Sequence, residues 1–163
     1  MYKRALVPLD GSPVAEAIIP FILEIAGPLD MAVRLLRVVE PIPPLVVEGA
    51  SSVIADDPIA RERDAEEYLA PLAAELRARG IEATWEVRRG PAAAAILAAG
   101  KYFRADLIAM STHGRSGLGR LLFGSVAEQV LRRADVPVFL MRQTEVQVAA
   151  RAAREMTRWA ARS

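Results

Sequence analysis

The feature that most constrains the fold is a regular alternation of short apolar runs with segments of helical periodicity. The apolar runs occupy residues 3–9, 32–39, 105–110 and 136–142, and a run of alternating polar and apolar residues occupies 81–87. Between them, apolar residues recur at helical spacing in 11–27, 58–80, 90–103 and 124–134. Continuous apolar strands are typical of a sheet that is covered on both faces. This order predicts an α/β fold, a doubly wound five-stranded parallel sheet with right-handed crossovers and helices on both faces.

Capping and proline residues mark where the first two helices begin and where the first one bends. Ser12 followed by Pro13, and Asp57 followed by Pro58, are typical of an N-cap residue and a first helical residue. Pro20 lies inside the first helical pattern, where its missing N–H and its ring should bend the helix or loosen one turn.

Proline also shapes the segment around the second helix. Pro71 lies inside that helix and predicts a kink. Residues 41–58 hold four prolines and few helix signals. They predict a long loop, which is the best candidate in this chain for a mobile segment.

Composition limits the chemistry that the chain can perform. The 163 residues suffice for one domain that buries a core without cross-links. The chain has no cysteine and one histidine, which excludes disulfides, thiolate catalysis and cysteine zinc sites, so we expect no metal held by side chains. A formal net charge of +1 gives no overall basic field for nucleic acid. We therefore expect a soluble cytoplasmic protein that binds neither nucleic acid nor a membrane.

Residues 143–163 have the pattern of an amphipathic helix appended to the α/β unit. One face collects apolar residues, namely Val148, Ala152, Met156, Trp159 and Ala160, and the opposite face collects Arg151, Arg154, Arg158 and Arg162. We expect the apolar face to dock on the domain or on a dimer partner. Two alternatives remain, a basic helix that binds anionic lipid or nucleic acid, and a frayed tail.

The glycine-rich segment "MSTHGRSGLGRLLFGSV", residues 110–126, is either a plain turn or a cradle for phosphate. It lacks the Gly-Lys-[Ser/Thr] of a Walker loop, and Leu122 stands where a dinucleotide fingerprint requires its third glycine. Gly114 and Gly124-Ser125 remain, with the N-terminus of a helix that favours anions and with Arg115 and Arg120 as phosphate-binding side chains. The alternative needs no ligand, because residues 125–128 spell the capping box S-x-x-E with Ser125 as the cap.

Ligands of open α/β sheets bind beyond the carboxyl ends of the strands, where the strand order reverses. If the first strand lies between the second and the fourth, Asp10, Val38 and the glycine-rich segment meet around one crevice. Asp10 has an alternative interpretation as an ordinary Asp-Gly turn. His113 lacks an evident partner for a catalytic triad, and we expect it to face solvent or to make a structural hydrogen bond.

The segments "ALVPLDGSPVAEAIIPFI", "VRLLRVVEP" and "ADLIAMSTHGRSGLGRLLFGSVAEQVLRRADVPVFLMR" resemble the universal stress protein family over residues 2–142. The resemblance implies the strand order 3-2-1-4-5 and a family-like α/β domain over residues 1–142. The helical extension predicted over 143–163 lies outside the resemblance. One branch of the family binds ATP through the pattern G-x2-G-x9-G-[Ser/Thr]. Here Gly114, Gly124 and Ser125 match that pattern, and Ser111 replaces its first glycine. A requirement for positive φ at Ser111 would strain the backbone.

The same resemblance implies a set of site residues and partners. The ATP-binding residues would be Pro8, Leu9, Asp10, Val38, Met110, Ser111, His113, Gly114, Arg115, Ser116, Gly124, Ser125 and Val126. Asp10 would contact the ribose or the adenine, and the Val38 backbone would face the adenine edge. Mg²⁺ would be bridged through the phosphates. A homodimer would form through the fifth strand. The amphipathic pattern of 143–163, outside the resemblance, offers the C-terminal helix as a second dimer element.

The leading hypothesis is therefore an ATP-binding protein of stress response or signalling with weak or no ATPase activity. The alternative is a dimeric interaction module of the same family that binds no nucleotide. A third hypothesis, a nucleotide hydrolase or transferase, would rely on His113 and Arg115.

Overall fold

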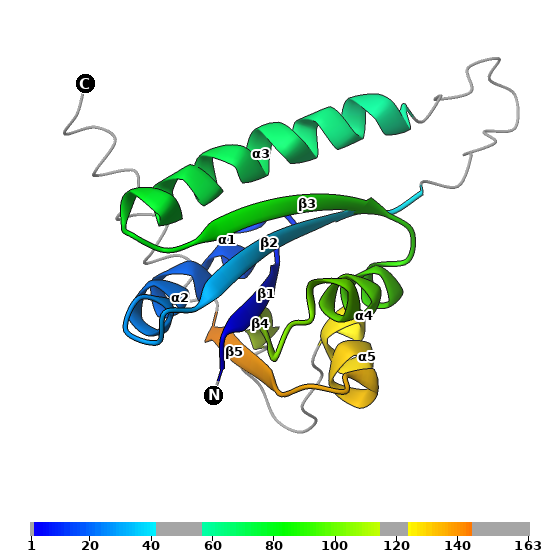
Figure 1. Cartoon of the computed structure of the whole chain (residues 1–163). Helices are drawn as coiled ribbons and strands as arrows, with labels where there is room; N and C mark the ends of the chain where they lie inside the picture. Colours follow the sequence, from blue (N-terminus) through cyan, green and yellow to red (C-terminus); the bar gives the residue numbers. More distant parts are fainter. Residues whose placement is uncertain (1, 42–56, 115–123, 145–163) are drawn as a thin grey trace, which may run out of the picture.

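A computed structural model of the chain describes residues 2–41, 57–114 and 124–144 and orders them around one parallel sheet (Figure 1). The strands are β1 (Arg4–Pro8), β2 (Ala32–Val39), β3 (Ala83–Arg89), β4 (Leu107–Gly114) and β5 (Val138–Thr144). The helices are α1 (Pro13–Glu16), α2 (Ile18–Ala26), α3 (Pro58–Ala78), α4 (Ala92–Phe103) and α5 (Ser125–Arg133). The predicted loop 41–58 and the predicted C-terminal helix lie almost entirely outside the described residues.

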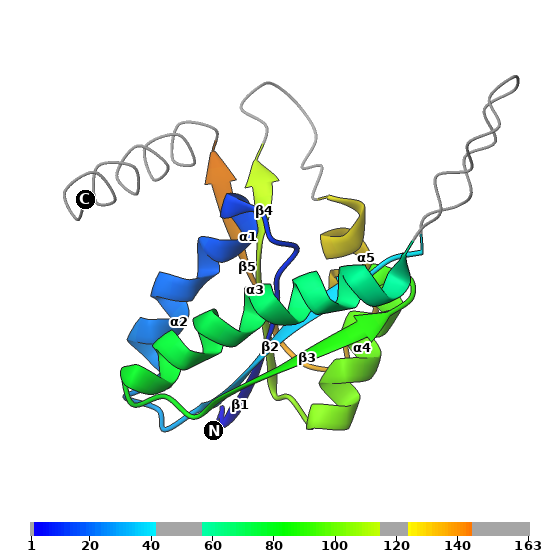
Figure 2. The same cartoon turned by 90° about the horizontal axis from the view of Figure 1, so that it is seen from above.

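The sheet has the order β3-β2-β1-β4-β5, and every neighbouring pair is parallel, so the predicted α/β topology is confirmed. In Figure 2 the arrows of β4 and β5 run at a large angle to the arrow of β3, because the sheet is twisted. The edge strands are β3 and β5. The predicted exposure of the third strand is confirmed, since one residue of β3, Ala83, is buried.

Each face of the sheet packs against its own helices. On one face, Ile18, Ile22, Leu35 and Leu69 form part of a core with α1, α2 and α3. On the other face, Leu6, Leu36, Ile108 and Val130 form part of a second core with α4 and α5. Burying a side chain of this size contributes about 1.5–3 kcal/mol. The two cores explain why β1, β2 and β4 are apolar at consecutive positions.

The first helical segment is interrupted at the position that Pro20 dictates. Helix α1 ends at Glu16, and α2 begins at Ile18 after Ala17. Pro20 has no N–H for the carbonyl of residue 16, and its ring collides with that carbonyl in a regular helix. The expected loosening of one turn is therefore confirmed. Helix α3, in contrast, runs through Pro71 as a single element.

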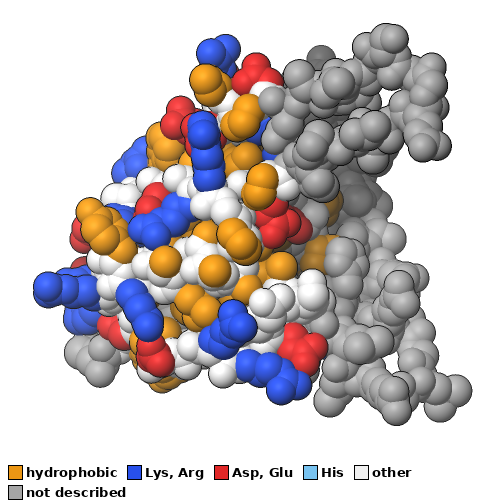
Figure 3. All heavy atoms as spheres, turned by 90° about the vertical axis from the view of Figure 1, so that its right-hand side faces the viewer, with side chains coloured by type: hydrophobic (Ala, Val, Ile, Leu, Met, Phe, Trp, Pro, Cys, Tyr) orange, Lys and Arg blue, Asp and Glu red, His pale blue; other side chains and the backbone are white. Residues whose placement is uncertain are grey.

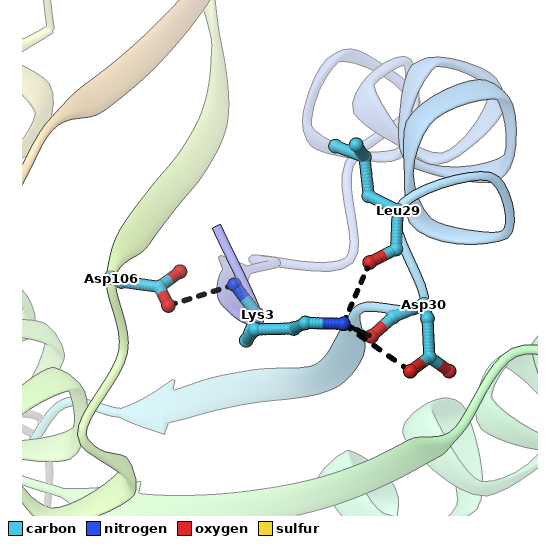
Figure 4. A network of polar contacts seen from close by, with 4 residues as sticks. All are labelled: Lys3, Leu29, Asp30 and Asp106. Atoms are coloured by element: carbon cyan, nitrogen blue, oxygen red, sulfur yellow. Dashed lines mark hydrogen bonds and ion pairs between the residues drawn. The ribbon is translucent and has the colours of Figure 1, made fainter. Parts of the chain in front are cut away.

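Polar contacts tie the amino end of β1 to the segments that precede β2 and β4 (Figure 4). The carboxylate of Asp106, just before β4, accepts the N–H groups of Lys3 at 2.8 Å and Arg4 at 3.0 Å. The Lys3 ammonium bonds the Leu29 carbonyl and forms an ion pair with Asp30 at 3.3 Å. These bonds hold the amino ends of β1, β2 and β4 together, at the end of the sheet opposite to the carboxyl ends.

The surface carries charges of both signs. Figure 3 shows one face of the molecule, on which the described Lys and Arg side chains alternate with Asp and Glu rather than gather in one basic field. Among the helices of the described residues, none is both long and apolar enough to cross a membrane.

Candidate functional site: a cavity where β1 and β4 separate

The sheet opens at the carboxyl ends of its central strands. β1 pairs with β2 up to Pro8 and Leu36, and β4 pairs with β5 up to Gly114 and Thr144. β1 and β4 themselves pair only at Ala5–Leu107 and Leu6–Ile108. Beyond Ile108 the two strands therefore separate, and β4 continues without β1 beside it. This is the point at which the strand order reverses, where open α/β sheets bind their ligands.

A cavity of about 350 Å³ lies at this opening. It brings together nine of the thirteen predicted site residues, namely Pro8, Leu9, Asp10, Val38, Met110, Ser111, Gly124, Ser125 and Val126. Two more, His113 and Gly114, are the last two residues of β4. Arg115 and Ser116 lie outside the described residues.

The backbone groups of Val38 point into the opening. Leu36 lies on the same strand and accepts the Leu9 N–H at 2.8 Å, so its polar groups face β1. Val39 faces the other way, since its carbonyl accepts the Gly90 N–H at the β3 side. Because alternate residues of a strand direct their N–H and C=O to the same neighbour, Val38 also faces the β1 side, beyond the last residue of β1 that pairs with β2. The two groups of Val38 are thus available at the cavity.

Asp10 lies in a tight turn between β1 and α1. Its Oδ1 accepts the Ser12 N–H at 2.8 Å, an Asx-type bond within the turn. Gly11 has φ +83°, in the left-handed region that favours glycine. Ser12 then caps α1, as predicted, by accepting the Ala15 N–H at 3.1 Å. The turn interpretation of Asp10 is therefore correct, and the same turn also places Asp10 at the cavity wall.

The N-terminus of α5 differs from the predicted capping box. The helix begins at Ser125 itself, and Gly124, with extended backbone angles, is the N-cap without a side-chain cap bond. The Gly124 N–H instead donates to Thr112 Oγ1 at 3.3 Å, so β4 holds the start of this helix. The prediction that Ser125 is the N-cap was wrong. The N-cap is one residue earlier, at Gly124, whose N–H bonds to another element. Gly124 and Ser125 line the cavity.

Ser111 fits the strand without backbone strain. The described non-glycine residues with positive φ are Asp30 and Arg104, so Ser111 needs no glycine-like conformation. Its Oγ is buried and has no hydrogen-bond partner among the described residues. A buried hydroxyl without a partner is unusual in a protein and marks a place where water or a ligand group completes the bonding.

Other cavity residues were not among the predicted site residues. Among them are Ser12, Val14, Ala15, Leu36, Glu40, Ala92, Ile96, Thr112 and Ala127. Glu40 follows β2, and its Oε1 accepts the Ala92 N–H at 2.9 Å, which caps α4 from another element. Within the described part of the chain, no three His, Asp or Glu side chains come together as a metal site.

The geometry defines a class of protein. An open, doubly wound parallel sheet with a cavity at its switch point, lined by a helix N-terminus and by backbone polar groups, is the arrangement of α/β proteins that bind small anionic or nucleotide-like ligands.

Comparison with known proteins gives the family. Residues 1–142 match the model of the universal stress protein family. The universal stress protein MJ0531 of Methanocaldococcus jannaschii is 31% identical over 145 residues, which cover 88% of this chain and 84% of that protein. The chain belongs to the universal stress protein family.

Solved structures share the fold at lower identity. A universal stress protein from Archaeoglobus fulgidus in complex with dAMP is 20% identical, with a TM-score of 0.60 over 85% of this chain and 97% of that one. A universal stress protein in complex with cAMP is 18% identical, with a TM-score of 0.62 over 86% of this chain and 97% of that one. At these identities the likeness concerns the fold.

Proposed function

We propose that this chain is an ATP-binding universal stress protein that acts in stress response or signalling by holding the nucleotide. The observation that carries the proposal is the separation of β1 from β4 beyond Ile108, which opens the cavity next to the backbone groups of Val38 that face it. Two structural relatives were solved with adenine nucleotides, cAMP and dAMP. The pattern Gly114, Gly124-Ser125 supports ATP in particular.

The cavity wall suits the parts of a nucleotide. Val38 offers one backbone acceptor and one backbone donor, which are the groups that the 6-amino and N1 edge of adenine requires. Leu36, Ile96 and Met110 supply apolar wall for a base. Asp10 would accept a ribose hydroxyl. The uncapped N-terminus of α5, with the Ser125 hydroxyl, would bind phosphate. Mg²⁺, if bound, would rely on phosphate oxygens and water.

ATP hydrolysis is expected to be weak or absent. A general base for water must have a free basic atom in reach of the phosphate. The acidic side chains on the described cavity wall are Asp10 and Glu40, and each already accepts a backbone N–H, from Ser12 and Ala92 respectively. Each bond uses one carboxylate oxygen, and the proposed ribose contact uses Oδ2 of Asp10. We therefore assign neither carboxylate to the activation of water and expect the nucleotide to be retained rather than turned over.

The binding test uses a matched pair of variants on α4. Mass spectrometry of the denatured, freshly purified chain and calorimetric titration with ATP are expected to detect the nucleotide. Ala92→Leu adds bulk at the cavity wall and should weaken ATP, whereas Ala94→Leu, exposed two residues further on, should not. Absence of bound nucleotide together with no affinity below the millimolar range would refute the proposal and leave the interaction module as the function.

We also propose that the chain forms a homodimer through β5. This strand lies at the edge of the sheet, and an edge strand presents unpaired N–H and C=O groups that favour pairing with another chain. The Pro137 carbonyl accepts the Ile108 N–H and so faces β4. By alternation, the backbone groups of Val138 and Leu140 face the open edge. A dimer would pair these groups.

A further inference from the structure

A cationic side chain lies directly behind the turn that carries Asp10. Arg37 belongs to β2, next to Val38, and projects on the opposite face from it, toward α1 and α3. A β-carbon built on Gly11 would lie 2.1 Å from Arg37 Nη1 and 3.1 Å from its Cζ. The guanidinium therefore occupies the space that any larger residue 11 would fill. The φ of +83° favours glycine at position 11, and a larger residue there would also displace the end of the Arg37 side chain.

The guanidinium is itself held by α3. Arg37 Cζ lies 5.1 Å from the centre of the Tyr68 ring, within the range of a cation–π contact. Tyr68 Oη donates to Glu16 Oε1 at 2.9 Å, which ties α3 to α1. Burial raises the pKa of the Tyr68 phenol, and the bond to Glu16 raises it further, so Tyr68 remains a donor at neutral pH. Side chains of α1, α3 and β2 thus converge on the back of the Asp10–Ser12 turn.

The front of the same turn faces the cavity. The turn uses one oxygen of Asp10, since Oδ1 accepts the Ser12 N–H, and leaves Oδ2 for a ligand. The direction of Oδ2 depends on how the turn sits on β2. Arg37 lies close both to Gly11 of the turn and to the Tyr68 ring, so a change of this side chain would alter the packing behind the turn.

We propose that Arg37 is a positioning residue for nucleotide binding, which packs against Gly11 and thereby aims the Asp10 carboxylate at the ribose hydroxyls. The inference rests on the proposed function of the same cavity. Arg37 does not line the cavity in the described structure, so it would act through Asp10 and not by touching the ligand.

The test compares ATP with 2′,3′-dideoxy-ATP, which lacks the ribose hydroxyls. The wild-type chain should prefer ATP by about tenfold or more, the effect of one hydrogen bond to a carboxylate. Arg37→Met keeps much of the side-chain length and removes the positive charge and the forked hydrogen-bond donors of the guanidinium. It should lower the affinity for ATP to near that for dideoxy-ATP and leave the affinity for dideoxy-ATP unchanged. Arg37→Lys, which keeps the positive charge, should restore part of the preference.

Controls separate positioning from a general loss of structure. Arg34→Met makes the same substitution on the same strand, but Arg34 stacks on Phe103 and pairs with Glu86 on the α4 side. This variant should keep the wild-type preference for ATP over dideoxy-ATP. Thermal unfolding without ligand checks that each variant is folded. If the Arg37→Met variant does not fold, the same comparison is made with Arg37→Gln.

The possible results distinguish the two proposals. If the wild-type chain prefers ATP and Arg37→Met keeps the full preference, Arg37 has no positioning role, although the proposed function stands. An equal loss of affinity for ATP and for dideoxy-ATP in a folded Arg37→Met variant also overturns the inference, because it indicates that the whole cavity has changed. If the wild-type chain binds neither nucleotide, the proposed function is wrong and the role of Arg37 falls with it.

Discussion

Asp10→Ala should lower two quantities by different amounts, because the two carboxylate oxygens have different partners. Oδ1 accepts the Ser12 N–H at 2.8 Å in an exposed turn. Losing a hydrogen bond of this kind costs about 1 kcal/mol of folding free energy. For a domain of this size that corresponds to a fall of roughly 2–4 °C in Tm. Oδ2 is the atom that we expect to accept a ribose hydroxyl.

The loss in nucleotide affinity should be larger than the loss in stability. A hydrogen bond between a carboxylate and a hydroxyl contributes about 1.5–3 kcal/mol, which is roughly a tenfold to 150-fold change in Kd. Asp10→Asn keeps an acceptor for Ser12 and removes the charge, so its Tm should stay near the wild-type value while its ATP affinity takes an intermediate value. Asp64→Ala, on the exposed face of α3, removes one negative charge elsewhere and is the control.

The assays are differential scanning calorimetry without ligand and isothermal titration with ATP. Unchanged ATP affinity in Asp10→Ala, with a lowered Tm, would refute the ribose contact and show that Asp10 only forms the turn. An equal fall in Tm for Asp10→Asn and Asp10→Ala would refute the assignment of the turn bond to Oδ1.

Three further substitutions test other parts of the structure. Gly11→Ala should lower the free energy of unfolding by about 1–3 kcal/mol in urea titrations, because φ is +83° and Arg37 Nη1 must move; wild-type stability would contradict this. Asp106→Ala removes two backbone N–H acceptors at the far end of the sheet and should lower stability by about 1–3 kcal/mol with ATP affinity intact. Leu140→Pro deletes an outward N–H of β5 and should weaken a dimer in light scattering more than Leu140→Ala, which removes the same side-chain contacts; equal effects would argue against pairing of the β5 edges.

The sequence predicted well those features that depend on local chemistry. Strand β2 has the predicted bounds, 32–39, because its apolar run ends at Glu40 and Pro41. Asp57 caps α3 through its Oδ1, as the Asp-Pro pair indicates. The break after Glu16 follows from Pro20 four residues later. Each of these features depends on residues that are close together in the sequence.

Features decided by tertiary contacts were missed. The start of α5 depends on Thr112, which accepts the Gly124 N–H across 12 residues of sequence and takes the place of the predicted Ser125 cap. The cap of α4 by Glu40 joins residues 52 apart. The contact of Arg37 with Gly11 joins two strand ends that only the parallel register brings together. Periodicity and capping patterns hold no information on such pairs.

The charges of the cavity wall indicate which part of a nucleotide it can select. The charged side chains that line it in the described structure are Asp10 and Glu40, and both are acidic. Carboxylates accept hydrogen bonds from hydroxyl and amino groups, which ribose and adenine supply, and they repel phosphate. Phosphate binding at this wall must therefore rest on neutral donors, the first N–H groups of α5 and the Ser125 hydroxyl, and on any cation that accompanies the ligand. In the proposed function, the nucleoside would therefore determine specificity at this wall, and the preference for one, two or three phosphates would depend on groups outside it.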